Sequence, residues 1–485
     1  NDSATIGKLR KLFSYSDDSN PFDAEETESI ISSIEKIRIL DPACGSGAFP
    51  MGILHKLVLA LHKLDPQNTK WKKRLIEGVP PELQAEVEQS LQNKSLDYIR
   101  KLGLIEHCIF GVDIQEIAIQ ISKLRFFISL LIEQEIDDSK ENRDIRALPN
   151  LETKFVAANT LIELGESKYL KSQKVINLEE ELFKVRERIF YTNSRSEKYK
   201  LQRKLTDIRN QLKTELAKVG FPNDKAEKIT QWDPFDQNTH AEWFDPEWMF
   251  GVKTGFDIVI GNPPYGIKFS ENEKEYFKKQ YLCTKTITGK QKGSSDSFAL
   301  FIEKGFNILK RNGNLIYIVP ISITSSDSMT ALHNLLEKNC RLIKISSYAV
   351  RPQPIFQNAV INTSILFFIK TLTPVEQILC TKMYRKGKGF DLKTLLENLQ
   401  FIDVRNYKLY GRYPKISLPI ETNILDKLFS IKTKTKDLIR KNGEPIYYRF
   451  AGGRYFKVVT PYKTGSSAEK IIYFDKHIAN NIGAI

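Results

Sequence analysis

Two short loop sequences, each placed directly after an apolar run, constrain the fold of this chain most. The run Ile37–Leu40 leads into Asp41–Gly47 (DPACGSG), and the run Phe256–Gly261 leads into Asn262–Tyr265 (NPPY). Residues 48–64 are mostly small and apolar, which predicts a helix directly after the first loop. A strand, a glycine-rich turn and a helix in this order are typical of open α/β sheets, which bind ligands at the carboxyl ends of their strands.

Strand-like and helix-like segments alternate along most of the chain. The other strand-like runs are His107–Ile114, Thr153–Ala158, Asn314–Pro320, 341–350 and 360–370, and apolar helices are predicted over 117–132, 296–310 and 329–338. This alternation predicts an α/β fold with a doubly wound, mostly parallel sheet.

Two segments interrupt this alternation. Residues 65–103 form a polar, helix-prone insertion. Residues 163–219 carry interspersed charges, with apolar residues at three- and four-residue steps, and this pattern predicts two antiparallel helices broken near residues 192–194. The second segment is therefore expected to be a helical hairpin inserted between core strands.

Length and charge indicate a further division of the chain. At 485 residues it is too long for one compact core, so two or three domains are expected. We predict an N-terminal segment at 1–36, a sheet domain at 37–370 and a C-terminal α+β domain at 371–485. The last part holds 21 Lys and Arg against 10 Asp and Glu, which is +11 of the net charge of +14. Such a basic region is typical of phosphate-binding surfaces, although basic composition also aids solubility.

Several classes of protein and site are disfavoured. The chain has no apolar run of membrane-spanning length and no secretory signal, which disfavours membrane and secreted proteins. Its five cysteines lack CxxC spacing, so reduced thiols in the cytoplasm are expected. His55 and His62 fit packing or surface positions better than a metal site, and no metal is predicted. The chain begins without Met and stops abruptly at Ile485, so we expect it to be a piece of a longer polypeptide.

The first loop has the features of a site for a nucleotide-like cofactor. Gly45 and Gly47 let the backbone approach a ligand, and the following helix N-terminus favours a carboxylate or phosphate. Asp41 at the strand end can accept a hydrogen bond from a ligand amino group. Asp113 ends the second strand, where an acidic side chain can bind both ribose hydroxyls; the alternative role is that of a helix cap.

The second loop suits a flat substrate that carries an amino group. The side-chain oxygen of Asn262 and the carbonyl of Pro263 can accept the two hydrogens of an exocyclic amine, which directs its lone pair at a methyl sulfonium. Pro263 and Pro264 hold the loop rigid, and Tyr265 can stack on the flat ring of the substrate. The tetrapeptide contains no acid, so no dedicated general base is predicted. On its own, NPPY is also an ordinary turn sequence.

In this combination and order the motifs resemble the N6-adenine DNA methyltransferases of the gamma arrangement, most of all the large type IIG restriction–modification and phage-defence relatives. The resemblance covers about residues 37–370 and implies a class I methyltransferase-like fold that binds S-adenosylmethionine. The positions that match the cofactor site are Asp41, Ala43, Cys44, Gly45, Gly47, Phe49, Asp113, Ile114 and Asn159. The matching catalytic positions are Asn262, Pro263, Pro264 and Tyr265, with Phe356 as a second aromatic against the flipped base or as an ordinary buried residue. Asn159 stands where Asp is common, and residues 1–36 contain no convincing match to the family's motif upstream of the first strand.

The resemblance also implies double-stranded DNA as the partner, with the target base rotated out of the duplex. Residues 371–485 would then be an incomplete target-recognition domain, in which Arg449, Arg454 and Lys457 contact DNA. Nuclease or further specificity segments are expected elsewhere in the same longer polypeptide.

Three alternatives stay open at this point. A protein glutamine N5-methyltransferase also presents a planar nitrogen to NPPY, but those enzymes are compact and this chain has a large basic C-terminal region. N4-cytosine methylation is chemically close, and Asn rather than Ser at position 262 favours adenine. The chain could also be a DNA- and cofactor-binding module that is inactive without missing segments, which the intact NPPY argues against.

Overall fold

The computed structural model describes two compact units, Asn1–Ser417 and Leu418–Ile485. The described residues run from 3 to 483 with gaps at 17–18, 80, 93, 137, 140–142, 144–148, 166–171, 193–194, 237, 356–359, 388, 390, 409–411, 434, 450–458, 464 and 466–468. Among the described helices, none combines the length and the apolar character that a membrane crossing requires. All five cysteines are buried and none is in a disulfide.

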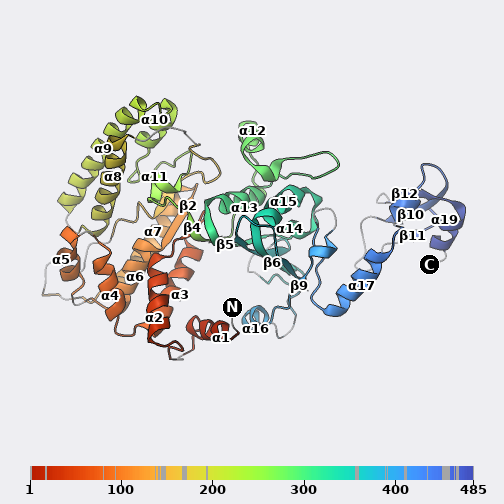
Figure 1. The fold of residues 1–485 in the computed structure, drawn as a ribbon, viewed down its shortest axis with the longest axis horizontal. Helices are drawn as coiled ribbons and strands as arrows, with labels where there is room; N and C mark the ends of the chain where they lie inside the picture. Colours follow the sequence, from red (N-terminus) through yellow and green to blue (C-terminus); the bar gives the residue numbers. More distant parts are fainter. Residues whose placement is uncertain are drawn as a thin grey trace. The chain divides into compact units, whose positions relative to one another are not determined.

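A nine-stranded sheet organises the first unit (Figure 1), in the order β3–β2–β1–β4–β5–β7–β6–β8–β9. Its strands are β1 (Ile39–Asp41), β2 (Ile109–Asp113), β3 (Phe155–Ala157), β4 (Phe256–Gly261), β5 (Leu309–Pro320), β6 (Cys340–Tyr348), β7 (Thr363–Lys370), β8 (Gln377–Tyr384) and β9 (Ile402–Asp403). From β3 to β5 all neighbours are parallel, whereas β7 runs antiparallel to both β5 and β6. The predicted α/β fold with a mostly parallel sheet is confirmed.

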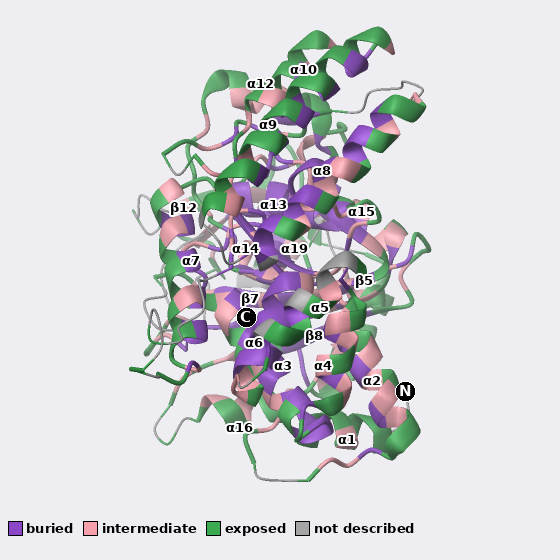
Figure 2. Ribbon diagram, turned by 90° about the vertical axis from the view of Figure 1, so that its left-hand side faces the viewer, coloured by how far each residue is buried: buried purple, intermediate pink, exposed green. Residues whose placement is uncertain are grey.

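Helices surround this sheet and fill the segments between its strands. In the first unit they are α1 (Ser3–Leu12), α2 (Ala24–Lys36), α3 (Ala48–Leu64), α4 (Thr69–Glu77), α5 (Pro81–Ser90), α6 (Leu96–His107), α7 (Glu116–Leu131), α8 (Gln173–Tyr191), α9 (Arg195–Lys218), α10 (Asn223–Gln231), α11 (Pro246–Phe250), α12 (Glu271–Gln280), α13 (Ser297–Ile308), α14 (Ser322–Ser325), α15 (Thr330–Asn339) and α16 (Leu392–Glu397). Figure 2 shows the buried residues gathered in the sheet and the helices against it, whereas α12 is mostly exposed. The pair α8–α9 agrees with the helical hairpin expected from the charge and apolar pattern.

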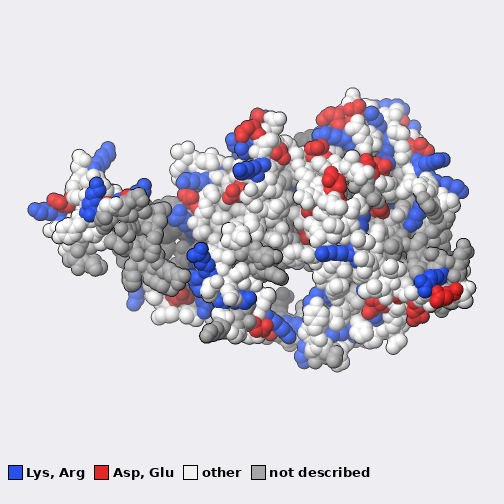
Figure 3. Space-filling model, turned by 180° about the vertical axis from the view of Figure 1, so that it is seen from behind, with Lys and Arg blue, Asp and Glu red and all other residues white. Residues whose placement is uncertain are grey.

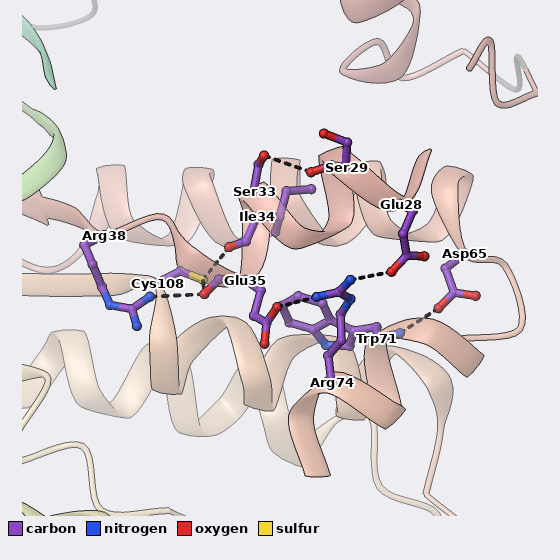
Figure 4. Close-up of polar contacts among 10 residues, drawn as sticks. All are labelled: Glu28, Ser29, Ser33, Ile34, Glu35, Arg38, Asp65, Trp71, Arg74 and Cys108. Carbon is purple, nitrogen blue, oxygen red and sulfur yellow. Dashed lines mark hydrogen bonds and ion pairs between the residues drawn. The ribbon is translucent and has the colours of Figure 1, made fainter. Parts of the chain in front are cut away.

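The N-terminal helices are part of the core of the first unit. Ile31 and Ile34 of α2 are buried in the same apolar cluster as residues of α3 and α6. Arg74 of α4 reaches back to α2, where its Nη1 donates to Glu35 Oε2 at 2.7 Å and its Nη2 pairs with Glu28 (Figure 4). These contacts tie the predicted N-terminal segment to the first insertion.

The sheet continues past residue 370, where the sequence predicts its domain to end. β8 pairs in parallel with β6, and β9 pairs antiparallel with β8. The first unit therefore extends to Ser417, because backbone hydrogen bonds tie residues 377–403 to the sheet. The functional division at residue 370 stays a prediction.

The second unit is a small α+β assembly. Its elements are α17 (Pro419–Ser430), α18 (Thr435–Leu438), β10 (Glu444–Arg449), β11 (Val459–Thr460), β12 (Glu469–Phe474) and α19 (Lys476–Gly483). The three strands form an antiparallel sheet in the order β11–β10–β12. Ile446, Phe474 and Ala479 make its buried centre.

Candidate functional site

The two loops predicted from the sequence meet at one edge of the sheet. β1 and β4 are parallel neighbours, with Ile39 opposite Ile258. Asp41 and Gly261 therefore end their strands side by side. A Cβ atom built on Gly261 would lie only 2.5 Å from Asp41 Oδ1, so only glycine fits at the residue that precedes NPPY. This close approach brings the two loops, more than 200 residues apart in the chain, into one site.

Asp41 carries a buried carboxyl group with spare hydrogen-bonding capacity. Its side chain is 2% exposed, and Oδ1 accepts from the backbone N–H of Ala43 at 3.1 Å. Within the described residues, Oδ2 accepts no hydrogen bond. Burial, with a smaller contribution from the nearby charge of Asp113, raises the pKa of Asp41 to about 8. A buried acid of this kind is suited to a ligand that brings its own positive donor.

Replacing Asp41 with asparagine should stabilise the ligand-free protein more at pH 8 than at pH 5. In the unfolded chain Asp41 loses its proton above the usual pKa of 3.8, whereas in the folded protein it keeps the proton up to about pH 8. A rise in pH from about 4 to 8 therefore destabilises the wild type. The free energy of unfolding of Asp41→Asn minus that of the wild type should grow by up to about 1.4 kcal/mol per pH unit and level off above pH 8. Thermal unfolding of both proteins at the two pH values measures it. Equal differences would mean that Asp41 is ionised in the folded protein.

The first loop is a tight turn held by side chains from neighbouring elements. Gly45 and Gly47 have φ values of 53° and 81°, and Gly47 caps α3. The hydroxyl of Ser122 donates to Gly45 O at 2.9 Å, and a Cβ on Gly47 would lie 2.9 Å from that hydroxyl oxygen. Thr160, which is also buried, donates from Oγ1 to Pro42 O at 2.7 Å. The turn thus needs both glycines. The hydroxyls of Ser122 and Thr160 lie 77 and 118 residues from the carbonyls they bind, so the loop motif alone does not reveal them.

Asp113 links the end of β2 to the same turn. Its Oδ2 accepts from Gly45 N and its Oδ1 from Gln115 N, each at 2.9 Å. The side chain is half-buried, and Ile114 beside it is 47% exposed. Asp113 therefore holds the glycine turn and the start of α7 in place, but it is not the helix cap given as its alternative role, because the N-cap residue of α7 is Gln115. Each carboxylate oxygen still has a second lone pair that can accept from a hydroxyl group.

The remaining predicted cofactor positions surround the turn. Asn159 follows β3, where its backbone N–H donates to Ala241 O at 2.8 Å and its Oδ1 accepts from Leu161 N at 3.2 Å. Cys44 is buried, and burial raises the pKa of its thiol well above the usual range. Phe49 is half-buried and lines an apolar cavity of about 600 Å³ between the start of α3 and the sheet.

The NPPY loop presents two unused acceptors. Asn262 is exposed, and within the described residues neither its side chain nor the carbonyl of Pro263 has a hydrogen-bond partner. The next carbonyl, that of Pro264, accepts from Ser297 Oγ at 2.7 Å. Tyr265 is half-buried. Ser297 is the first residue of α13, so this hydrogen bond anchors the NPPY loop to that helix. The two residues are 33 positions apart, and the sequence motif does not predict their contact.

Part of the predicted site lies outside the described residues. These positions are Phe356, Arg454 and Lys457. Arg449 is the last residue of β10, but its side chain is not among the parts that the structure describes. Their assigned roles stay predictions.

Comparison with known proteins gives distant but extensive matches. A relative from Methanocaldococcus jannaschii is 22% identical over 93% of this chain and 41% of its own length. The type II restriction enzyme and methyltransferase RM.Eco57I of Escherichia coli is 23% identical over 90% of this chain and 34% of its own. The adenine-specific methyltransferase BrxX of Escherichia coli is 23% identical over 68% of this chain and 25% of its own.

The chain thus spans between a third and about two fifths of the length of the first two relatives. Residues 107–356, just over half of the chain, match the Eco57I restriction-modification methylase family as a continuous stretch. This stretch contains β2, Asp113, β4 and the NPPY loop. The chain therefore belongs to the Eco57I restriction-modification methylase family, and its cofactor is S-adenosylmethionine.

Proposed function

We propose that this chain methylates the exocyclic N6 of an adenine that is rotated out of double-stranded DNA. The observation that carries the proposal is the contact between Gly261 and Asp41. This contact joins the NPPY loop, whose Asn262 Oδ1 and Pro263 O have no partner in the described part of the chain, to the glycine turn. The name of the relative BrxX, an adenine-specific methyltransferase, agrees with adenine as the target. Extrusion of the base follows from the chemistry, because N6 lies inside the base pair of an intact duplex.

The residues around the turn fit the cofactor. S-Adenosylmethionine supplies an electrophilic methyl group when it is bound. The Asp41 side chain is buried, and its Oδ2, which accepts no hydrogen bond among the described residues, suits the amino group of the methionine end. Asp113 is the last residue of β2 and Asn159 follows β3. At these strand ends a carboxylate can accept from ribose hydroxyls and an amide can bind an adenine edge.

The NPPY loop is suited to activate an amine without a base. An adenine amino group is a poor nucleophile because its lone pair is delocalised into the ring. Acceptance of its two hydrogens by Asn262 Oδ1 and Pro263 O favours a pyramidal nitrogen, whose lone pair then points at the methyl group. Ser297 fixes the carbonyl of Pro264, so the loop needs little rearrangement. Tyr265 would stack on the extruded base.

Methyl transfer with a tritiated cofactor tests the proposal directly. Plasmid DNA and total protein are offered as acceptors, and labelled DNA is digested to nucleosides. Label in N6-methyladenine supports the proposal, whereas label in N4-methylcytosine or in protein would replace it by the cytosine or glutamine alternative. Cofactor binding by calorimetry without transfer to any acceptor would leave only a binding module.

Replacing Asp113 with alanine should mainly weaken cofactor binding. The change removes the acceptor proposed for the ribose and also two hydrogen bonds that hold Gly45 and Gln115. We expect the Kd for S-adenosylmethionine to rise roughly 10- to 100-fold, as for the loss of one or two charged hydrogen bonds. Titration calorimetry measures this, and Asp113→Asn, which keeps one acceptor oxygen, should lose less. A Kd that does not change in Asp113→Ala would exclude the ribose role.

A further inference from the structure

A short basic hairpin follows α12 and has no role in the site described so far. Ile287 and Gln291 exchange backbone hydrogen bonds of 3.0 and 2.9 Å, and Ser294 N donates to Cys283 O at 2.8 Å. The five residues Thr286–Lys290 at the turn of this hairpin are all exposed. Figure 1 shows α12 and the loop beside it projecting from the sheet. The hairpin Cys283–Ser294 therefore presents its tip to the surroundings.

The base of this hairpin is firmly held. Glu303 of α13 is buried, and its two oxygens accept from Leu282 N and Cys283 N at 2.7 Å each. On the other arm, Gln291 Oε1 accepts from Asn334 Nδ2 at 2.8 Å. A Cβ on Gly293 would lie 2.1 Å from Thr284 O, so the arms are in close contact. The hairpin is thus formed before any partner binds, which lowers the cost of binding.

The hairpin is basic throughout, unlike its surroundings. Thr284–Gly293 carries three lysines and no acid, whereas α12 carries three of each sign. Acidic and basic side chains are also interspersed over the face of the molecule shown in Figure 3. Lys285 Nζ binds carbonyls at the end of α12, and Lys292 Nζ pairs with Asp327 at 2.7 Å.

The tip itself combines a free charge with an apolar side chain. Within the described residues, the ammonium of Lys290 has neither a hydrogen bond nor an ion pair. Ile287 is 50% exposed. A cation and an aliphatic group on one rigid tip suit a partner with an anionic backbone and apolar faces, as in duplex DNA.

The hairpin lies close to the NPPY loop. Ser294 precedes Ser297 by three residues, and the hydroxyl of Ser297 is 2.7 Å from Pro264 O. Three residues span at most about 10 Å of extended chain, so the hairpin base is within roughly one DNA radius of the loop. A duplex that delivers a base to NPPY would pass within reach of the tip.

We propose that the hairpin Cys283–Ser294 binds the DNA beside the target base. Lys290 binds a backbone phosphate, and Ile287 packs against sugars or bases next to the position that the extruded base leaves. This inference rests on the proposed function for its choice of partner. It adds a DNA contact in the sheet unit, separate from the basic C-terminal region.

Salt-dependent binding of the whole chain to plasmid DNA tests the role of Lys290. Each phosphate contact contributes about 0.9 to the slope of log affinity against log salt, so Lys290→Ala should reduce the slope by about that amount. The matched control is Lys73→Ala, since Lys73 lies on α4 with its side chain 73% exposed. The control should keep the wild-type slope. Equal slopes for both variants would overturn the phosphate contact.

Ile287→Ala tests the apolar contact in the same assay. We expect the affinity for DNA to fall by roughly tenfold with an unchanged slope, because an apolar contact releases no counterions. Ile287→Leu should restore most of the affinity. An unchanged affinity in Ile287→Ala would overturn this part of the proposal.

The two proposals fail in different ways. If the wild type methylates DNA and both hairpin variants bind like the wild type, the hairpin proposal is wrong and the proposed function stands. If no DNA is methylated, but Lys290→Ala reduces the slope and Ile287→Ala reduces the affinity, the DNA contact stands and the proposed function is wrong. Thermal unfolding of each variant verifies that the exposed tip tolerates the change.

Discussion

Replacing Asn262 with alanine is expected to lower the rate of methyl transfer at least about 100-fold, the usual effect of losing one preorganised hydrogen bond at a reacting group. Affinity for S-adenosylmethionine should stay within about twofold, because an exposed side chain without partners among the described residues supports little else. The loss should therefore fall on the chemical step. Single-turnover transfer to DNA and titration calorimetry separate the two quantities.

A matched substitution controls for nonspecific damage. Asn307 lies exposed on α13, and Asn307→Ala should leave both the rate and the affinity unchanged. Near-normal turnover in Asn262→Ala would mean that the amino group is not activated through this side chain. The proposed geometry of the NPPY loop would then be wrong.

Replacing Gly261 with alanine should impair both catalysis and cofactor binding. The added Cβ would lie 2.5 Å from Asp41 Oδ1, so either the carboxylate or the end of β4 must move. A displacement of about 1 Å at a reacting group can cost roughly 100-fold in rate, and we expect a loss of that size. The Kd for S-adenosylmethionine should rise about tenfold, because the same clash displaces the acceptor proposed for its amino group.

Gly261→Ala should lower the transfer rate and also weaken cofactor binding, whereas Asn262→Ala should lower the rate alone. Gly7→Ala is the control, since a Cβ on that residue of α1 would meet nothing within 4 Å. Thermal unfolding of Gly261→Ala shows how much of the loss is global, since overpacking costs about 1–3 kcal/mol. A variant with normal rate and normal Kd would contradict the close approach of β1 and β4.

The parts of the site that were predictable from the sequence are those set by local chemistry. Glycines at positive φ and consecutive prolines restrict the backbone wherever they occur, so both loops could be located at strand ends. The contact of Asp41 with Gly261 could not be derived in this way, because it depends on which strands become neighbours. The hydroxyl of Ser297 was missed for the same reason, since its partner lies 33 residues earlier.

The fold shows the same division between local and nonlocal signals. The helices of the insertion α8–α9 follow from their own charge and apolar pattern. β5 begins at Leu309, inside the helix predicted over 296–310, because Leu309 pairs with Phe256 of β4. Likewise, the antiparallel β7 lies between β5 and β6, an order that no single segment encodes. Tertiary pairing overrides local preference in both places.

The pairing of β8 with β6 matters for anyone who exchanges C-terminal parts between relatives. A chimera joined at residue 370 would remove β8 and leave the backbone groups of β6 along that edge without partners. Bare strand edges recruit other chains, so such a hybrid would aggregate. A junction after Ser417 keeps the native edge covered and transplants only the small second unit.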